Sequence, residues 1–235
     1  MRTVAGVVED ALAEMFGERV AITGAGRTDT GVHACGQVIS FALPRPFPID
    51  RLAIALSHGL PRDVSVRDVT IVDASFSARF SARSRRYVYA LLCRPDPSAL
   101  LVRYAWHVRR PLDVSAMQSA SAHLVGEHDF RSFCGALPES GQSVRRVSHL
   151  ALERRGELLR IEIVADGFLH HMVRTIVGTL VECGRGRRDP GSLPEVLAAR
   201  NRAAAGLTAP PHGLYLAGVT YEDGYDSFRE PWPFS

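Results

Sequence analysis

The sequence contains no lysine, so all 28 of its basic residues are arginine. Arginine suits bidentate contacts with phosphate and stacking on nucleic-acid bases, although a GC-rich genome would give the same bias. The net charge is only +3, so any RNA affinity must come from arginines gathered on one face. One such cluster comprises Arg79, Arg83, Arg85 and Arg86, for which a solvated strand edge is the ordinary alternative.

The sequence also lacks long apolar runs and paired cysteines. No apolar stretch reaches the roughly 18 residues of a membrane span, and the start carries charges where a signal peptide would be apolar. The four cysteines, Cys35, Cys93, Cys134 and Cys183, include no C-x-x-C pair, which predicts reduced thiols in a cytoplasmic protein. No metal site is expected, because the adjacent His170 and His171 fall on a predicted helix and would point in different directions.

Helical and strand patterns alternate along the 235 residues, which indicates an α/β (α+β) protein. Expected helices cover residues 4–15, 50–56, 114–124, 168–181 and 193–199, the second capped by Asp50. Expected strands cover residues 20–23, 37–43, 64–72, 86–92, 144–152, 158–164 and 214–221. The proline-containing stretch 93–100 is a natural crossover, so we predict two halves, residues 1–100 and 101–235.

A glycine-punctuated segment, GAGRTDTGVHA at residues 24–34, carries Arg27 and Asp29 between two expected strands. A dinucleotide-binding fingerprint would need a helix to follow, and a P-loop would end in Lys-Ser or Lys-Thr, so both are excluded. Glycines allow tight turns that can present an arginine and a carboxylate to a substrate from a rigid frame. Asp29 is therefore the candidate catalytic group.

Arg174 is the second candidate. It lies off the apolar stripe of the expected helix 168–181, in one row with His170 and Gly178. Gly178 would let another backbone approach beside the guanidinium. The ordinary alternative is an arginine on the solvent side of a core helix.

Several segments together resemble the tRNA pseudouridine synthase A family. They are GAGRTDTGVHACGQVISF, FSARFSARSRRYVY, GEHDFRSF, GFLHHMVRTIVGTL and GLYLAGV, and they occur in the family's order from about Thr3 to Tyr221. The resemblance implies the pseudouridine synthase fold, in which two ferredoxin-like α/β halves with antiparallel sheets meet at a central cleft and helices pack on the sheets.

The resemblance also implies roles for particular residues. In the family, the aspartate that Asp29 matches is the nucleophile, and the arginine that Arg174 matches pairs with it. Tyr87 matches a tyrosine that stacks on the target uracil, whereas Tyr89 is expected in the core. Arg27 matches an arginine that helps to extrude the target nucleotide, and a salt bridge that rigidifies the loop is its ordinary role.

The implied activity is isomerisation of uridine to pseudouridine in the tRNA anticodon stem-loop, at positions 38, 39 and 40, by a cytoplasmic homodimer without a cofactor. Family members usually begin with a strand and a Tyr-Asp-Gly loop ahead of the first helix, and this sequence shows no match to that segment. If the truncation is real, the first sheet lacks a strand; a start codon assigned too far downstream explains the missing match equally well. Two alternatives are a catalytically impaired, truncated relative that binds tRNA and, more weakly, a hydrolase with Asp29 as nucleophile.

Overall fold

The computed structural model describes residues 2–222 and 224–234, and the chain forms two compact units. Unit 1 comprises Met1–Arg27 and Val38–Ala82, and unit 2 comprises Thr28–Gln37 and Arg83–Ser235. The short segment with Asp29 therefore packs with the second unit, although its neighbours in sequence belong to the first. The two halves predicted from the sequence, 1–100 and 101–235, stay a prediction.

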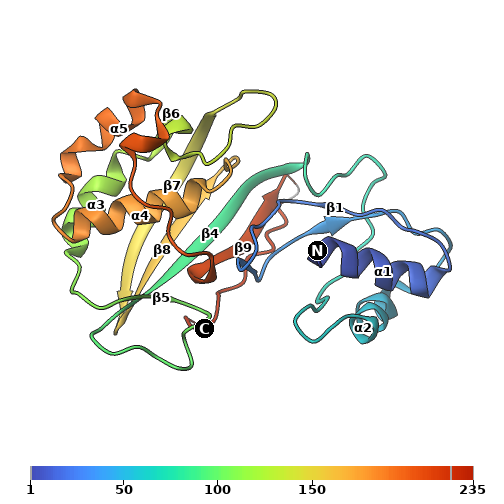
Figure 1. Cartoon of the computed structure of the whole chain (residues 1–235). Helices are drawn as coiled ribbons and strands as arrows, with labels where there is room; N and C mark the ends of the chain where they lie inside the picture. The colour runs from blue at the N-terminus through green and yellow to red at the C-terminus, as the bar shows by residue number, and fades with distance from the viewer. Residues whose placement is uncertain (1, 223, 235) are drawn as a thin grey trace. The chain divides into compact units, whose positions relative to one another are not determined.

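Unit 1 is built on two helices, α1 (Val4–Phe16) and α2 (Ile49–Gly59) (Figure 1). The Thr3 side chain caps α1, and Gly17 ends it in a left-handed conformation. Both helices were predicted, but the cap at Asp50 was not correct. Pro48 holds the capping position of α2, and Asp50 lies inside the first turn. Its negative charge there interacts favourably with the helix dipole and stabilises the helix.

The strands of unit 1 are shorter than predicted. β1 (Thr23–Gly24) pairs antiparallel with β3 (Ile39–Ser40), and no strand forms over residues 64–72. Val64, Val66 and Val69 pack against the unit 1 core. The Ser57 hydroxyl bonds both the amide and the carbonyl of Val66 at 3.2 Å. A side chain thus supplies the backbone partners that a neighbouring strand would have given.

Unit 2 contains a mixed sheet of seven strands. They are β2 (His33–Ala34), β4 (Ala82–Cys93), β5 (Trp106–Val108), β6 (Gly126–Asp129), β7 (Val144–Arg155), β8 (Leu158–Ala165) and β9 (Leu214–Tyr221). The order is β2-β9-β4-β8-β7-β6, and β5 pairs with the end of β4. The pairs β4–β8, β8–β7 and β7–β6 are antiparallel, whereas β2–β9 and β4–β5 are parallel. The expected antiparallel pairing is thus present in the long strands β4, β7 and β8, and the short strands β2 and β5 add parallel pairs.

Three helices lie over one face of this sheet (Figure 1). They are α3 (Val114–Ala122), α4 (Met172–Gly184) and α5 (Leu193–Ala199). Along the chain, the short helical turns η1 (Phe130–Phe133) and η2 (Pro190–Ser192) lie between these helices, and η3 (Arg202–Ala204) and η4 (Pro211–Gly213) follow α5. The predictions for 114–124, 193–199 and 214–221 are confirmed. The mixed α/β class is confirmed as well.

The register of β4 and β8 separates two chemically different faces. Tyr87 and Tyr89 stand opposite Ile163 and Ile161, so these four side chains share one face. Arg86 pairs with Val164 in the ladder, and its alternation places it with Arg160 and Glu162 on the other face. The first face carries the candidate site.

Two absences hold within the described part of the chain. The four cysteines are all free thiols. Among the described helices, none has both the length and the apolar character needed to cross a bilayer.

Candidate active site

The Asp29 loop is a tight turn that leads into strand β2. The Val32 amide donates to the Asp29 carbonyl at 3.1 Å, and Gly31 turns the chain at a φ of +85°. Only glycine adopts such a φ without strain, which is why the turn contains one. Asp29 is half-buried, with 28% of its side chain exposed. The loop thus fixes the carboxylate yet leaves it open to a ligand.

His33 anchors the other end of this turn. Its ring stacks between Tyr104 and Tyr215, with ring centroids 5.3 and 4.8 Å away. Its Nε2 is 2.8 Å from the Arg103 carbonyl. Because His33 also pairs in register with Tyr215 on β9, the strand that follows Asp29 is held by both backbone and side chain. The residues that follow the turn are therefore held in place, and this fixes the position of the Asp29 turn.

Arg174 pairs directly with Asp29. Its Nη1 lies 2.7 Å from Asp29 Oδ2, and its Nε donates to the Ala209 carbonyl at 2.8 Å. Only 13% of the arginine side chain is exposed, so the ordinary alternative of a solvent-facing arginine is wrong. Two hydrogen bonds from one planar guanidinium fix both its position and the direction in which it meets the carboxylate.

The segment around Leu207 supports Arg174 from behind. A Cβ atom at Gly178 would lie 1.8 Å from the Leu207 carbonyl oxygen, so only glycine admits this backbone, as the sequence suggested. The Gly206 amide donates to Thr179 Oγ1 at 2.9 Å, and the Ala209 amide donates to the Arg174 carbonyl at 3.0 Å. The arginine is therefore held at its backbone and at its side chain by the same loop.

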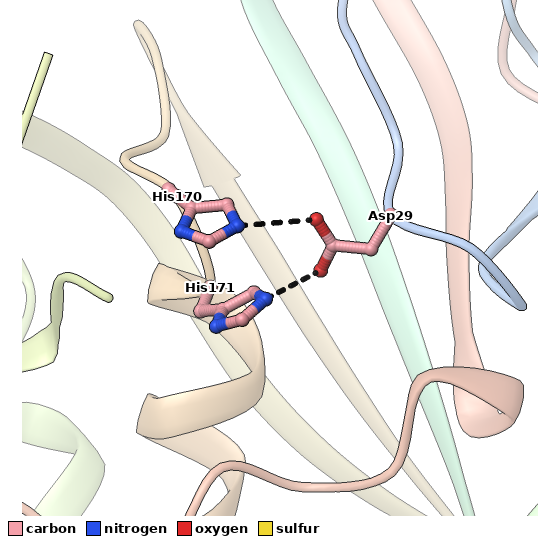
Figure 2. A group of neighbouring side chains, drawn as sticks. All are labelled: Asp29, His170 and His171. Carbon is pink, nitrogen blue, oxygen red and sulfur yellow. Dashed lines mark ion pairs between the residues drawn. The ribbon is translucent and has the colours of Figure 1, made fainter. Parts of the chain in front are cut away.

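His170 and His171 also face Asp29 (Figure 2). His170 Nε2 lies 3.7 Å from Asp29 Oδ1, and His171 Nε2 lies 3.4 Å from Oδ2. The imidazoles stack on each other with centroids 3.7 Å apart. The sequence argument that they point in different directions is wrong, because α4 begins only at Met172 and His171 precedes it with a φ of +63°. A left-handed residue turns the chain so that both rings lie on one side.

Gly135 sets the orientation of the two rings. A Cβ atom there would lie 2.8 Å from His171 Nδ1 and 3.0 Å from His170 Nδ1. The Gly135 amide also donates to the His170 carbonyl at 2.8 Å. The Nδ1 edges thus pack against a backbone and the Nε2 edges turn toward Asp29. Burial lowers the pKa of His171, although the Asp29 charge opposes that shift.

Tyr87 is buried on β4, and its ring meets Phe168 edge to face at a centroid distance of 5.0 Å. Burial, with a further contribution from the Asp29 charge, raises the pKa of Tyr87 to about 12. The hydroxyl therefore stays protonated near neutral pH. Tyr89 is fully buried and donates to the Pro210 carbonyl at 2.7 Å, which confirms the expected core position.

The remaining arginines singled out from the sequence are dispersed. Arg27 is exposed and belongs to unit 1, so its role in extruding a nucleotide stays a prediction. Arg83 pairs with Glu222, and Arg86 pairs with Glu162 and Asp226 at 3.6 Å. These two arginines of the cluster therefore face acidic side chains of their own unit.

Sequence reasoning missed the two histidines as neighbours of Asp29. It extended the helix back to Phe168 on apolar spacing alone, whereas no side chain caps α4 and a left-handed residue starts it. Histidine is one of the few residues enriched in that conformation besides asparagine and aspartate. That preference is a weak signal in a single sequence.

Comparison with known proteins decides the family. A family model described as tRNA pseudouridine synthase matches residues 1–81 and 120–222. The chain belongs to the tRNA pseudouridine synthase family. It is 45% identical over 219 residues to the tRNA pseudouridine synthase A of Moorella thermoacetica, an alignment that covers 93% of this chain and 89% of that protein. The proteins of the same name from Halalkalibacterium halodurans and Brevibacillus brevis are both 47% identical, over 91% and 93% of this chain and 81% and 90% of their own lengths.

Family membership agrees with the fold. The mixed sheets and packed helices of the two units are consistent with the pseudouridine synthase fold. Asp29, His170, His171 and Arg174 fall inside the matched ranges. Tyr87 lies between them, so its assignment depends on the resemblance of the neighbouring sequence and on its position in β4.

Proposed function

We propose that this protein isomerises uridine to pseudouridine in tRNA, with Asp29 as the catalytic nucleophile. The observation that carries the proposal is the ion pair between Asp29 and Arg174 in a chain of this family. The relatives it matches are named tRNA pseudouridine synthase A. The target uridines are those of the anticodon stem-loop, at tRNA positions 38, 39 and 40, and the enzyme works in the cytoplasm as a homodimer.

The reaction needs no change of oxidation state. The bond between uracil N1 and ribose C1′ breaks, the base turns, and a bond forms between uracil C5 and C1′. The proton lost from C5 is balanced by one gained at N1, so substrate and product are isomers. An ionised carboxylate and a pocket shielded from water are sufficient, and no cofactor is required.

Asp29 acts at the ribose. As nucleophile it attacks the sugar and is released when the C–C bond forms; as a base it removes a ribose proton and returns it to the ribose when the C–C bond forms. Both routes need an ionised carboxylate held in one place, and the adjacent guanidinium of Arg174 favours that form. The half-buried position of Asp29 leaves room for the sugar to approach.

Tyr87 and Arg27 act on the target base, Tyr87 by stacking and hydrogen bonding and Arg27 by assisting its extrusion. The phenol of Tyr87 stays protonated, so its hydroxyl can donate to the turning uracil while the ring stacks on it. Arg27, which is exposed and lies two residues before Asp29 in the sequence, assists extrusion of the nucleotide. A base in a stem must leave its stack before an enzyme can reach it.

The decisive experiment maps pseudouridine in unmodified tRNA incubated with the protein and with its Asp29→Ala variant. New pseudouridine at positions 38–40 with the intact protein alone is the expected result. Affinity for tRNA should stay within about tenfold in the variant, because phosphate contacts dominate binding. Asp63→Ala is a matched control, since Asp63 also pairs with an arginine, Arg2, but on an exposed surface of unit 1.

Three outcomes would contradict the proposal. Pseudouridine formation that survives Asp29→Ala would remove Asp29 from the chemistry. Binding of tRNA without any pseudouridine would identify a tRNA-binding protein instead. Release of free uracil or phosphate would point to a hydrolase.

A further inference from the structure

The two histidines beside Asp29 place three metal-binding groups on one side of the site. One ligand atom from each of Asp29, His170 and His171 lies within 4.8 Å of the others, and these three form a group with metal-ligand chemistry among the described residues. Two imidazole nitrogens and a carboxylate oxygen are a common ligand set of Zn²⁺ and related divalent transition metals. The proposed reaction uses no metal, so this arrangement has no part in it.

The distances suit a small tetrahedral ion. Zn²⁺ binds nitrogen and oxygen ligands at about 2.0–2.2 Å, which puts neighbouring ligands roughly 3.3–3.5 Å apart. His170 Nε2 lies 3.7 Å from Asp29 Oδ1 and His171 Nε2 lies 3.4 Å from Oδ2, so the two imidazoles approach different oxygens of one carboxylate. Both Nε2 atoms point toward the carboxylate (Figure 2). All three ligand atoms lie within 4.8 Å of one another, so rotation of the two imidazoles and of the carboxylate has to draw them closer before they contact one ion.

The surroundings support binding by these three atoms. Gly135 lies against the Nδ1 edges, so the rings are turned with their Nε2 atoms outward before any ion arrives. The His170 side chain is 48% exposed and that of His171 is 30% exposed. An ion can therefore enter from solvent and keep water in its remaining coordination position.

Arg174 lowers the affinity of these three side chains for a metal ion. Its Nη1 donates a hydrogen bond to Asp29 Oδ2 at 2.7 Å, so Oδ1 is the oxygen left for an ion. Its positive charge repels a dication a few ångströms away, because the interaction of two cations at that distance is unfavourable in a half-buried site. The guanidinium stays in place when an ion binds, since its Nε also donates to Ala209.

We propose that Asp29, His170 and His171 bind one Zn²⁺ ion reversibly, and that the bound ion inhibits the enzyme by occupying the Asp29 carboxylate. Binding is a property of these three side chains alone. The inhibition rests on the proposed function, because it requires Asp29 to act on the ribose. The ion and the target nucleotide would then compete for one carboxylate.

Co²⁺ is the probe for binding, because four-coordinate Co²⁺ shows visible d–d absorption. Titration of the metal-free protein should give one Co²⁺ per chain, displaced by Zn²⁺. His170→Gln and His171→Gln should each weaken binding at least tenfold, and circular dichroism should show that both variants keep the fold. His149→Gln is a matched control, since His149 Nε2 also faces a carboxylate, Glu162 Oε1, at 3.6 Å but has no second histidine beside it.

A second variant tests the role of charge. Arg174→Gln removes the neighbouring cation, and Co²⁺ binding should tighten severalfold, whereas a merely structural arginine would leave it unchanged or weaken it. Absence of Co²⁺ binding, binding that both histidine variants retain, or a thiolate-to-cobalt charge-transfer band from a cysteine would each overturn the proposal.

The activity arm separates the two proposals. Zn²⁺ should inhibit pseudouridine formation, and excess tRNA should restore it. Co²⁺ binding that depends on the histidines, in a protein without synthase activity, would support the metal site and refute the function. Synthase activity that depends on Asp29, without Co²⁺ binding, would refute the metal site alone.

Discussion

Arg174 and Asp29 are 145 residues apart in the sequence and 2.7 Å apart in the structure, joined through Nη1 and Oδ2. Each partner is fixed by a different device, since Asp29 lies on a turn anchored by β2 and Arg174 is bound at its Nε by the Ala209 carbonyl. The pair is therefore preorganised within one compact unit, as the proposed reaction of Asp29 with a ribose requires.

Arg174→Lys should lower the rate of pseudouridine formation by about a hundredfold. A lysine keeps the charge but cannot donate to Asp29 and Ala209 from one planar group, so the carboxylate loses its fixed direction. Single-turnover kinetics would measure the loss. Arg200→Lys is the control, because Arg200 pairs with Asp129 but is 64% exposed; an equal loss in both variants would contradict the argument.

Gly178→Ala should destabilise unit 2 by at least about 3 kcal/mol, because its Cβ would lie 1.8 Å from the Leu207 carbonyl oxygen. The displaced loop also carries Ala209, so the rate should fall in the protein that remains folded. Urea denaturation measures the first effect. Gly59→Ala provides the comparison, since its Cβ would meet only Ala11 at 3.5 Å, and it should be neutral or stabilising by up to about 1 kcal/mol. A small effect at Gly178 would mean that the loop relaxes.

The sequence predicted best those elements whose pattern and partners are local. α5 and β9 match the predicted bounds, because their ends coincide with changes in apolar pattern. The stretch 64–72 has the alternation of a strand but pairs with no strand among the described residues, and the Ser57 hydroxyl bonds the backbone of Val66 within it. No residue within the stretch carries that information.

The candidate site was likewise predicted only in part. The Asp29–Arg174 pair was expected through the family resemblance, whereas the residues alone favoured a solvent-facing arginine. The two histidines were missed because the left-handed backbone at His171, with a φ of +63°, turns the chain just before α4. One backbone angle decides whether His170 and His171 diverge or face Asp29 together, and apolar spacing does not report it.

Tyr87 should make the protein sensitive to alkali. Its pKa is raised by burial to about 12 in the folded state, against about 10 for an exposed tyrosine. Because the folded state holds this proton more tightly, the stabilisation is complete below pH 10 and is lost as the pH rises toward 12. From pH 8 to pH 11 the free energy of unfolding should fall by about 1.4 kcal/mol through this residue.

Urea denaturation at the two pH values, with Tyr87→Phe beside the intact protein, measures that contribution. The variant should lose about 1.4 kcal/mol less than the intact protein over the same range. Tyr225→Phe is the control, because Tyr225 is 42% exposed and the change removes no buried hydroxyl. An alkaline loss of the same size in Tyr87→Phe would show that the phenol does not contribute.

Glu162→Gln should destabilise the protein by about 3 kcal/mol. Glu162 and Arg160 form an ion pair whose side chains are each only 10% exposed, and Arg86 lies 3.6 Å from the same carboxylate. Neutralising Glu162 removes the carboxylate nearest to the buried Arg160 guanidinium and leaves it Glu230 as its remaining ion-pair partner. Glu222→Gln breaks the pair with Arg83, whose side chains are 72% and 62% exposed, and should cost less than about 1 kcal/mol. Urea denaturation of both variants decides the matter: equal losses would mean that Glu230, 3.0 Å from Arg160 Nε, compensates for Glu162.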